Sequence, residues 1–200
     1  MHLPTSSPRL LTGAAVIACA AALAPAAALA ATSAPVAPQA TAGAPPCATS
    51  GLVVWLNVPP GNGYTGGASY NLEFTNQSGH ACTLRGHPGV SAVSLNGHQF
   101  GSPAGWAASP ITTVTLANGA TATATLNVVD TGSFGLQCFS RPPGPGDPHG
   151  ILPTAAGLRV YPPGQTAAKV IPYPLQACAH TGPVWMGAGP VTPGRPGPGL

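Results

Sequence analysis

Carboxylates are the scarcest reactive groups in this 200-residue chain, which contains only Glu73, Asp130 and Asp147. Hydrolysis of a glycosidic bond needs two carboxyl groups that converge on that bond. Glu73 falls on the polar face of a predicted strand and Asp147 in a loop rich in Pro and Gly, so convergence is not expected. A Ser-His-Asp triad is not indicated either, because no Gly-x-Ser-x-Gly sequence is present to expose a nucleophile. We therefore expect a protein that is not an enzyme and has no catalytic residue.

Several histidines could ligate a metal ion, and two of them lie two residues from a cysteine. No pair of these residues has the C-x-x-C or H-x-x-x-H spacing that places two ligands on one turn. We expect no metal site and no cofactor. Metal handling remains the alternative function, and its candidate ligands are His80, His87, His98 and His180.

A binding role rests on aromatic side chains, and Trp106 is the best candidate for a ligand platform. It lies in the sequence Gly105-Trp106-Ala107, within a predicted loop. An exposed indole there could stack on a sugar ring. In the structural alternative, which we favour, Trp106 caps the open end of the core.

The charged residues exclude one class of partner. Lys and Arg number six against three acids, and they occur singly along the chain. A nucleic-acid-binding protein clusters its Lys and Arg to neutralise phosphates, so nucleic acid is not an expected partner.

The chain is 44% hydrophobic, which predicts a folded domain, and its 27 Gly and 26 Pro favour short strands joined by turns over long helices.

The N-terminus has the pattern of an export signal. A short segment with one positive charge, residues 1–9, precedes an apolar run over residues 10–31. Small residues at Ala28 and Ala30 predict cleavage after Ala30, so residues 1–30 are a signal peptide. Alternatively, Cys19 ends a lipobox-like sequence and would carry a lipid. No later apolar run could span a bilayer, so the mature chain is predicted to lack a transmembrane segment and to be secreted or to lie on the extracellular face of the cell envelope.

Removal of the leader leaves four cysteines, an even number in an oxidising compartment. Two disulfides are the natural interpretation, although three connectivities are possible. We favour Cys47–Cys82 with Cys138–Cys178, because each closes a loop of a few dozen residues and staples one half of the domain.

Short strands are predicted along the chain after an Ala/Pro/Thr-rich linker at residues 31–46. Residues 68–75 alternate apolar and polar side chains, which predicts a half-buried strand. Three hairpins are predicted, around Asn96-Gly97, Ala117-Asn118-Gly119 and Pro162-Pro163-Gly164-Gln165. The remaining predictions are a strand at 52–58, a last edge strand at 184–186 and a disordered Pro/Gly tail at 187–200.

These elements predict an all-β domain over residues 47–186. About seven or eight short strands with frequent turns favour an antiparallel immunoglobulin-like β-sandwich with two disulfides. Such a domain would serve as a non-enzymatic binding or scaffolding module, with a cell-wall polymer or another envelope protein as its partner.

Several motifs give the chain a resemblance to a known family. Thr75-Asn76-Gln77-Ser78 is followed by Cys82-Thr83-Leu84-Arg85-Gly86-His87-Pro88-Gly89-Val90, and later by Leu116-Ala117-Asn118-Gly119 and Leu158-Arg159-Val160-Tyr161-Pro162-Pro163-Gly164. This order resembles the bacterial DUF4232 family, with His87 in place of the family's usual Tyr. The resemblance covers residues 47–186 and implies an exported or lipid-anchored protein of unassigned function. We expect Gly86-His87-Pro88-Gly89 to be a turn in which both glycines adopt unusual φ angles.

Peptide mapping of the secreted protein without reduction tests these predictions together. We expect an N-terminal peptide that begins at Ala31 and two linked pairs of peptides, Cys47 with Cys82 and Cys138 with Cys178. A lipidated Cys19 at the N-terminus would overturn the predicted cleavage site, and any other pairing would overturn the predicted disulfides.

Overall fold

The computed structural model describes residues 43–146 and 150–194. The predicted signal peptide, Cys19, most of the predicted linker and Asp147 lie outside the described residues. Within them the protein is all-β, as predicted, with two short 3₁₀ segments, η1 (Thr49–Gly51) and η2 (Thr131–Gln137). The strands are β1 (Leu52–Asn57), β2 (Gly63–Tyr64), β3 (Gly67–Asn76), β4 (Cys82–Arg85), β5 (Gly89–Val93), β6 (Gln99–Phe100), β7 (Gly105–Trp106), β8 (Thr113–Leu116), β9 (Thr121–Val129), β10 (Thr154–Tyr161), β11 (Lys169–Gln176), β12 (Met186–Ala188) and β13 (Thr192–Pro193).

The described residues form more strands than the seven or eight predicted. Strands β2, β6, β7 and β13 contain only two residues each. A strand of that length has no room for an alternating pattern of apolar and polar side chains, so periodicity could not reveal it.

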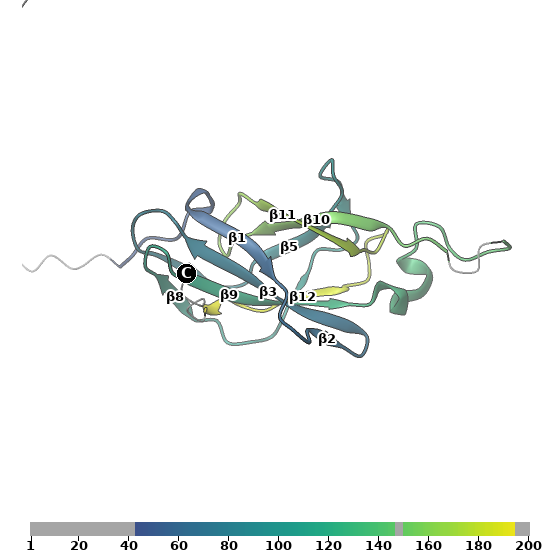
Figure 1. Cartoon of the computed structure of the whole chain (residues 1–200), viewed down its shortest axis with the longest axis horizontal. Helices are drawn as coiled ribbons and strands as arrows, with labels where there is room; N and C mark the ends of the chain where they lie inside the picture. Colours follow the sequence, from purple (N-terminus) through teal and green to yellow (C-terminus); the bar gives the residue numbers. More distant parts are fainter. Residues whose placement is uncertain (1–42, 147–149, 195–200) are drawn as a thin grey trace, which may run out of the picture. The chain divides into compact units, whose positions relative to one another are not determined.

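The strands form three sheets among the described residues (Figure 1). The largest has the order β1-β3-β9-β12-β7, with β2 on β3 and β13 on β9. The second has the order β11-β10-β5-β6, and the third is the pair β4-β8. All pairings are antiparallel except β12 with β7. The β-class and the antiparallel sheets are therefore as predicted.

The alternation predicted for β3 is confirmed. Leu72 and Phe74 are fully buried, whereas Asn71, Glu73 and Thr75 lie on the opposite face of the strand. In β9 the small side chains of Ala122 and Ala124 are also buried, so β9 packs closely on the core.

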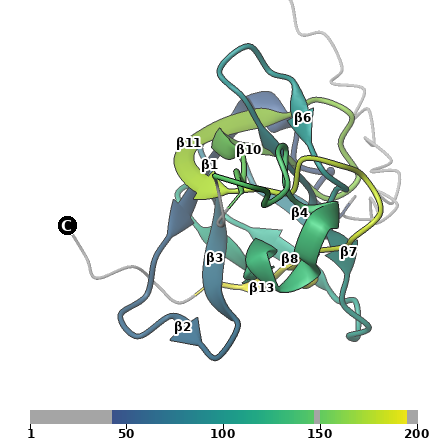
Figure 2. The same cartoon turned by 90° about the vertical axis from the view of Figure 1, so that its right-hand side faces the viewer.

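One hydrophobic core gathers side chains from all three sheets. Phe74 and Leu126 come from the largest sheet, Leu158 from the second and Leu84 from β4. Figure 2, which looks along the strands, shows β10 and β11 on one side of this core and β3, β8 and β13 on the other. Trp185 is among the largest fully buried side chains.

Two of the three predicted hairpins form. Strand β5 pairs with β6 across Asn96-Gly97, and β10 pairs with β11. The hairpin predicted around residues 117–119 was wrong, because β8 pairs with β4 and β9 pairs with β3. The segment between β8 and β9 instead connects two different sheets, the β4-β8 pair and the largest sheet. In this segment the Gly119 N–H donates to the carbonyl of Asn76, at the end of β3, at 2.6 Å.

The C-terminal prediction also needs correction. Strand β12 lies between β9 and β7 and is therefore not an edge strand. The disordered tail predicted from Gly187 is wrong for residues 187–194, because this stretch contains β12 and β13, β13 pairs with β9, and Val191 is fully buried. Residues 195–200 lie outside the described residues.

The predicted disulfides, Cys47–Cys82 and Cys138–Cys178, are confirmed. All four cysteines are buried. The bonds close loops with sequence separations of 35 and 40 residues. In the chain-entropy model, a loop of that size stabilises a domain by roughly 4 kcal/mol.

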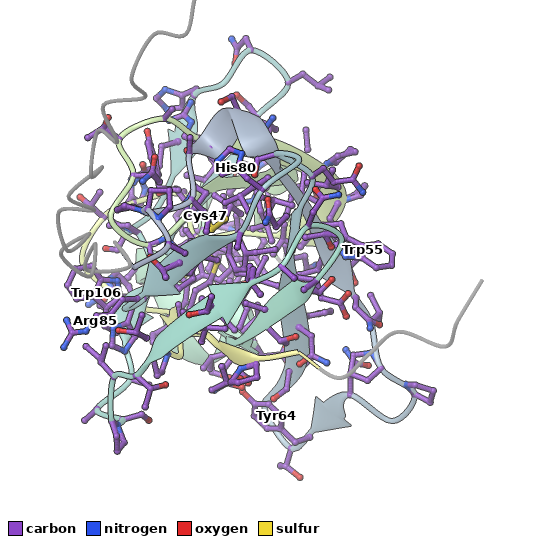
Figure 3. All side chains as sticks on the ribbon, turned by 90° about the vertical axis from the view of Figure 1, so that its left-hand side faces the viewer. Cys47, Trp55, Tyr64, His80, Arg85 and Trp106 are labelled. Carbon is purple, nitrogen blue, oxygen red and sulfur yellow. A yellow bond between two sulfur atoms is a disulfide. The ribbon has the colours of Figure 1, made fainter. Side chains whose placement is uncertain are left out.

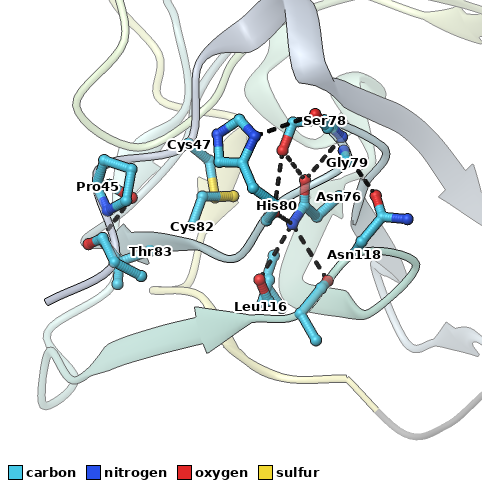
Figure 4. Close-up of a disulfide and its surroundings, with 12 residues drawn as sticks. Pro45, Cys47, Asn76, Ser78, Gly79, His80, Cys82, Thr83, Leu116 and Asn118 are labelled. Atoms are coloured by element: carbon cyan, nitrogen blue, oxygen red, sulfur yellow. Dashed lines mark hydrogen bonds between the residues drawn. A yellow bond between two sulfur atoms is a disulfide. The ribbon is translucent and has the colours of Figure 1, made fainter. Parts of the chain in front are cut away.

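The buried amide of Asn76 organises the end of β3 beside the Cys47–Cys82 bond (Figure 4). Its Nδ2 group donates to the carbonyl oxygens of His80 at 2.8 Å and Leu116 at 3.0 Å, with that of Ala117 at 3.2 Å. Its Oδ1 atom accepts from the Ser78 N–H at 3.0 Å and the Ser78 hydroxyl at 2.7 Å. Both ends of the amide are therefore satisfied without water.

Replacement of Asn76 tests this role. Asn76→Ala removes the side-chain donor to the carbonyls of His80, Leu116 and Ala117 and the side-chain acceptor of the Ser78 N–H, so we expect the free energy of unfolding to fall by about 2–3 kcal/mol. Asn118→Ala is the control: Asn118 is exposed, and its side chain accepts a single bond, from the Gly79 N–H. Urea denaturation of both oxidised variants measures the difference. Equal losses in the two variants would contradict the role of Asn76.

Candidate functional site

Trp106 is exposed and does not cap the core. The residue is 69% exposed and belongs to β7, where it lies opposite Ala188 in the parallel pairing with β12. The next residue holds the strand in place, since the Ala107 N–H donates to the Ala188 carbonyl at 3.0 Å. Trp185, and not Trp106, fills the core. The capping role favoured from the sequence was therefore wrong.

His87 supports the exposed indole. The two rings stack with their centroids 5.5 Å apart and their planes 14° apart. The Nε2 atom of His87 lies 3.0 Å from the Ala107 carbonyl oxygen, a geometry in which an Nε2–H group donates. The hydrogen bond to Ala107 thus fixes the imidazole next to β7. In this position the His87 ring stacks against one face of the Trp106 ring.

The loop that carries His87 is fixed at its first glycine. Gly86 has a φ of 109°, in the range that favours glycine, as predicted. Its carbonyl accepts from the Val191 N–H at 2.9 Å, which ties the loop to the C-terminal segment. The same prediction was wrong for Gly89, which begins β5 in ordinary extended backbone and pairs with Tyr161.

Arg85 adds a positive charge to this surface. It ends β4 and is exposed. Figure 3 shows Arg85 and Trp106 on the same side of the domain, opposite Trp55. We call Arg85, His87 and Trp106 the Trp106 surface. It combines an aromatic face with a hydrogen-bond donor, which are the groups that contact sugar rings and their hydroxyls.

The structure does not bring the candidate metal ligands together. His80 contacts the Ser78 carbonyl, His98 lies edge-on to Phe100 and His180 is exposed. No cluster of three or more His, Cys, Asp or Glu side chains occurs in the described part of the chain.

Two of the three acids lie far apart. Glu73 pairs with Thr123 in the middle of β3, and its carboxylate accepts from the Asn57 amide at 2.7 Å. The Asp130 N–H donates to the carbonyl of Gly66, seven positions along the chain from Glu73. At about 3.3 Å per residue, the backbones of Glu73 and Asp130 are roughly 20 Å apart, which is too far for a pair of hydrolytic carboxylates.

Sequence reasoning missed one contact between aromatic residues. Tyr70 of β3 and Tyr173 of β11 meet edge to face, with centroids 5.5 Å apart, and so join two different sheets. Burial, followed by a hydrogen bond and repulsion from Tyr173, raises the pKa of Tyr70 to about 12, while Asn62 lowers it. The residues next to each tyrosine in the sequence do not predict this contact, because the contact depends on how two sheets pack together.

The comparisons with known proteins identify the family. A family model described as "Domain of unknown function (DUF4232)" matches residues 47–192. The chain therefore belongs to this family, as the resemblance indicated. No curated protein matches the chain, and no solved structure matches it.

The described residues contain no candidate membrane span. None of their helices has the length and apolar character that crossing a bilayer would require.

Alkaline titration tests the environment of Tyr70. The native state keeps a proton that the unfolded state releases near pH 10, so the free energy of unfolding should fall as the pH rises from 10 to about 12. We expect the ultraviolet absorbance of tyrosinate to show one late component, which is lost in Tyr70→Phe and kept in Tyr161→Phe. A late component that persists in Tyr70→Phe would assign it to another tyrosine.

Proposed function

We propose that this member of the DUF4232 family is an exported, non-enzymatic domain that binds a polysaccharide of the cell wall through the Trp106 surface. The observation that carries the proposal is the exposure of Trp106 while His87 holds its ring from behind. A sugar ring would stack on the free face of the indole, and hydroxyl groups would bond to Arg85.

Rigidity is what makes this surface suited to binding. An exposed tryptophan on a mobile loop would lose conformational entropy when a ligand ordered it. Here the strand pairing of β7 with β12, the bond to Ala188 and the stack on His87 restrain Trp106 in advance. The gain from stacking is then not offset by ordering of the platform.

Export is supported by the sequence of the leader and by the disulfides. The two disulfides are typical of extracellular proteins, since reducing compartments keep thiols free. The separation of Glu73 from Asp130, together with the few acids in the chain, supports a non-enzymatic role.

We also propose that the architecture is an immunoglobulin-like sandwich. In support, the largest sheet and the β10-β5 sheet contribute to one core, as the two layers of a sandwich do. The short β4-β8 pair would then close one end of that core.

Sedimentation with insoluble peptidoglycan tests the proposed function. We expect the oxidised mature domain to be retained, and Trp106→Ala to weaken its binding by about tenfold, since an aromatic stacking contact is worth about 1 kcal/mol or more. Trp55→Ala is the matched control, because Trp55 is 51% exposed on β1 and lies on the opposite side of the domain (Figure 3).

Three results would overturn the proposal. The first is the absence of retention, the second is equal loss in Trp106→Ala and Trp55→Ala, and the third is Trp106-dependent retention by a purified envelope protein but not by the polymer. Circular dichroism of each variant confirms that the fold is intact.

A further inference from the structure

A cavity lies where β2, β3, β9 and β11 meet, and it is distinct from the Trp106 surface. Its volume is about 330 Å³, which is in the range of pockets for small organic molecules. Its walls include three tyrosines, one acid, one threonine and one glutamine, namely Tyr64, Tyr70, Tyr173, Asp130, Thr131 and Gln176. We call this cavity the tyrosine pocket.

The three aromatic rings come from three different strands, β2, β3 and β11. The ring of Tyr64 lies against the backbone of Gly67. A Cβ atom at position 67 would lie 2.7 Å from the Tyr64 hydroxyl and would collide with the Val128 carbonyl oxygen, so only glycine leaves room for this approach. Tyr70 and Tyr173 form the edge-to-face pair described above. Aromatic faces carry negative electrostatic potential, so walls of this kind attract cations.

Among the described residues, the lining carries one formal charge, that of Asp130. Asp130 is exposed, and its carboxylate makes no ion pair or hydrogen bond with any described residue. No described Lys, Arg or His lines the pocket to balance this charge. The pocket therefore favours a positively charged ligand and disfavours an anion.

An unpaired polar group lies beside the acid. Thr131 is 2% exposed, and its hydroxyl has no hydrogen-bond partner among the described residues. A buried hydroxyl without a partner is unfavourable, and this one lies in the wall of the pocket below its surface.

The ligand's chemistry follows from the donor set. One carboxylate with tyrosine hydroxyls is too few hard ligands for a divalent cation, and no cluster of metal-binding side chains occurs here in the described residues. A neutral hydrocarbon would fill the cavity but would gain nothing from the Asp130 carboxylate. An organic cation satisfies both the aromatic walls and the carboxylate.

The walls are also held together covalently. Thr131 begins η2, which leads to Cys138, and Gln176 lies two residues before Cys178. The Cys138–Cys178 bond thus ties the segment that carries Asp130 and Thr131 to the segment that carries Tyr173 and Gln176. A pocket whose walls are linked in this way loses less entropy when a ligand binds.

We propose that the tyrosine pocket binds an alkylated ammonium group, with its substituents against the rings of Tyr64, Tyr70 and Tyr173 and its charge near Asp130. This proposal does not rest on the Trp106 surface.

The test is a titration of the oxidised mature domain with choline, followed by two-dimensional amide NMR. The neutral isostere 3,3-dimethylbutan-1-ol is the control ligand, since it has the same shape without the charge. We expect saturable shifts at residues of the pocket and an affinity for choline about tenfold higher than that for the isostere.

Variants assign the contributions of charge and rings. Asp130→Asn should weaken choline binding by about tenfold and leave the isostere unchanged. Glu73→Gln, which removes an equal charge from the open face of β3, should leave choline binding unchanged. Tyr64→Ala should weaken the binding of both ligands, because it removes one aromatic wall of the pocket. Since Tyr64 is 47% exposed, its loss leaves the hydrophobic core intact.

Trp106→Ala separates this proposal from the proposed function, since it should weaken polymer binding about tenfold and leave choline binding intact. The proposal is overturned by equal affinity for choline and the isostere, by an affinity for choline that is unchanged in Asp130→Asn, or by the absence of saturable shifts. Shifts of the same residues by N-acetylglucosamine alone would assign the pocket to a neutral sugar instead.

Discussion

The buried amide of Asn76 is the interaction on which the arrangement of the sheets depends. Strands β4 and β8 pair only with each other among the described residues, so no strand pairing connects them to the largest sheet. The Asn76 side chain makes that connection, because it bonds the end of β3 to the carbonyls of His80 and Leu116 on either side of the β4-β8 pair. The Cys47–Cys82 bond lies beside it and adds a covalent link to the segment before β1. The amide and the disulfide thus act together with the two backbone hydrogen bonds that join Thr83 to the segment before β1.

A chain with 4% charged residues has few ionic ways to recognise a partner. In both proposed sites, aromatic rings would provide the main contact with the ligand. In both sites these rings are already restrained in the free protein. The stack on His87 restrains Trp106, and the close approach at Gly67 leaves Tyr64 beside the backbone. Rings have few rotatable bonds, so a restrained ring offers a large contact area with little further loss of entropy. The single acid at the tyrosine pocket matters more in this setting, because few neighbouring charges compete with it.

The sequence predicted what depends on local pattern. The alternation in β3 identified its buried face, the Asn96-Gly97 pair identified one hairpin, and the loop lengths between the four cysteines led to the correct pairing. It did not predict pairings between distant segments, such as β7 with β12, which join residues about eighty positions apart and have no local signal. Trp106 and Trp185 illustrate the limit. Both are indoles in short apolar segments, and only the pairing of β12 between β9 and β7 decides that Trp185 is buried and Trp106 is exposed.

Strand β3 connects the stabilising and binding features of the domain. Asn76 ends the strand at the Cys47–Cys82 bond, and Tyr70 lies six residues away, roughly 20 Å along an extended chain, at the tyrosine pocket. The second disulfide, Cys138–Cys178, joins the two segments that follow the walls of that pocket. The two bonds therefore have different consequences. Loss of Cys47–Cys82 acts on the packing of β4 and β8, whereas loss of Cys138–Cys178 frees the segments that carry Asp130 and Tyr173 relative to each other. Because the geometry of a pocket is more sensitive to such freedom than the burial of a core, ligand binding at the proposed tyrosine pocket would depend on the second bond more than on the first.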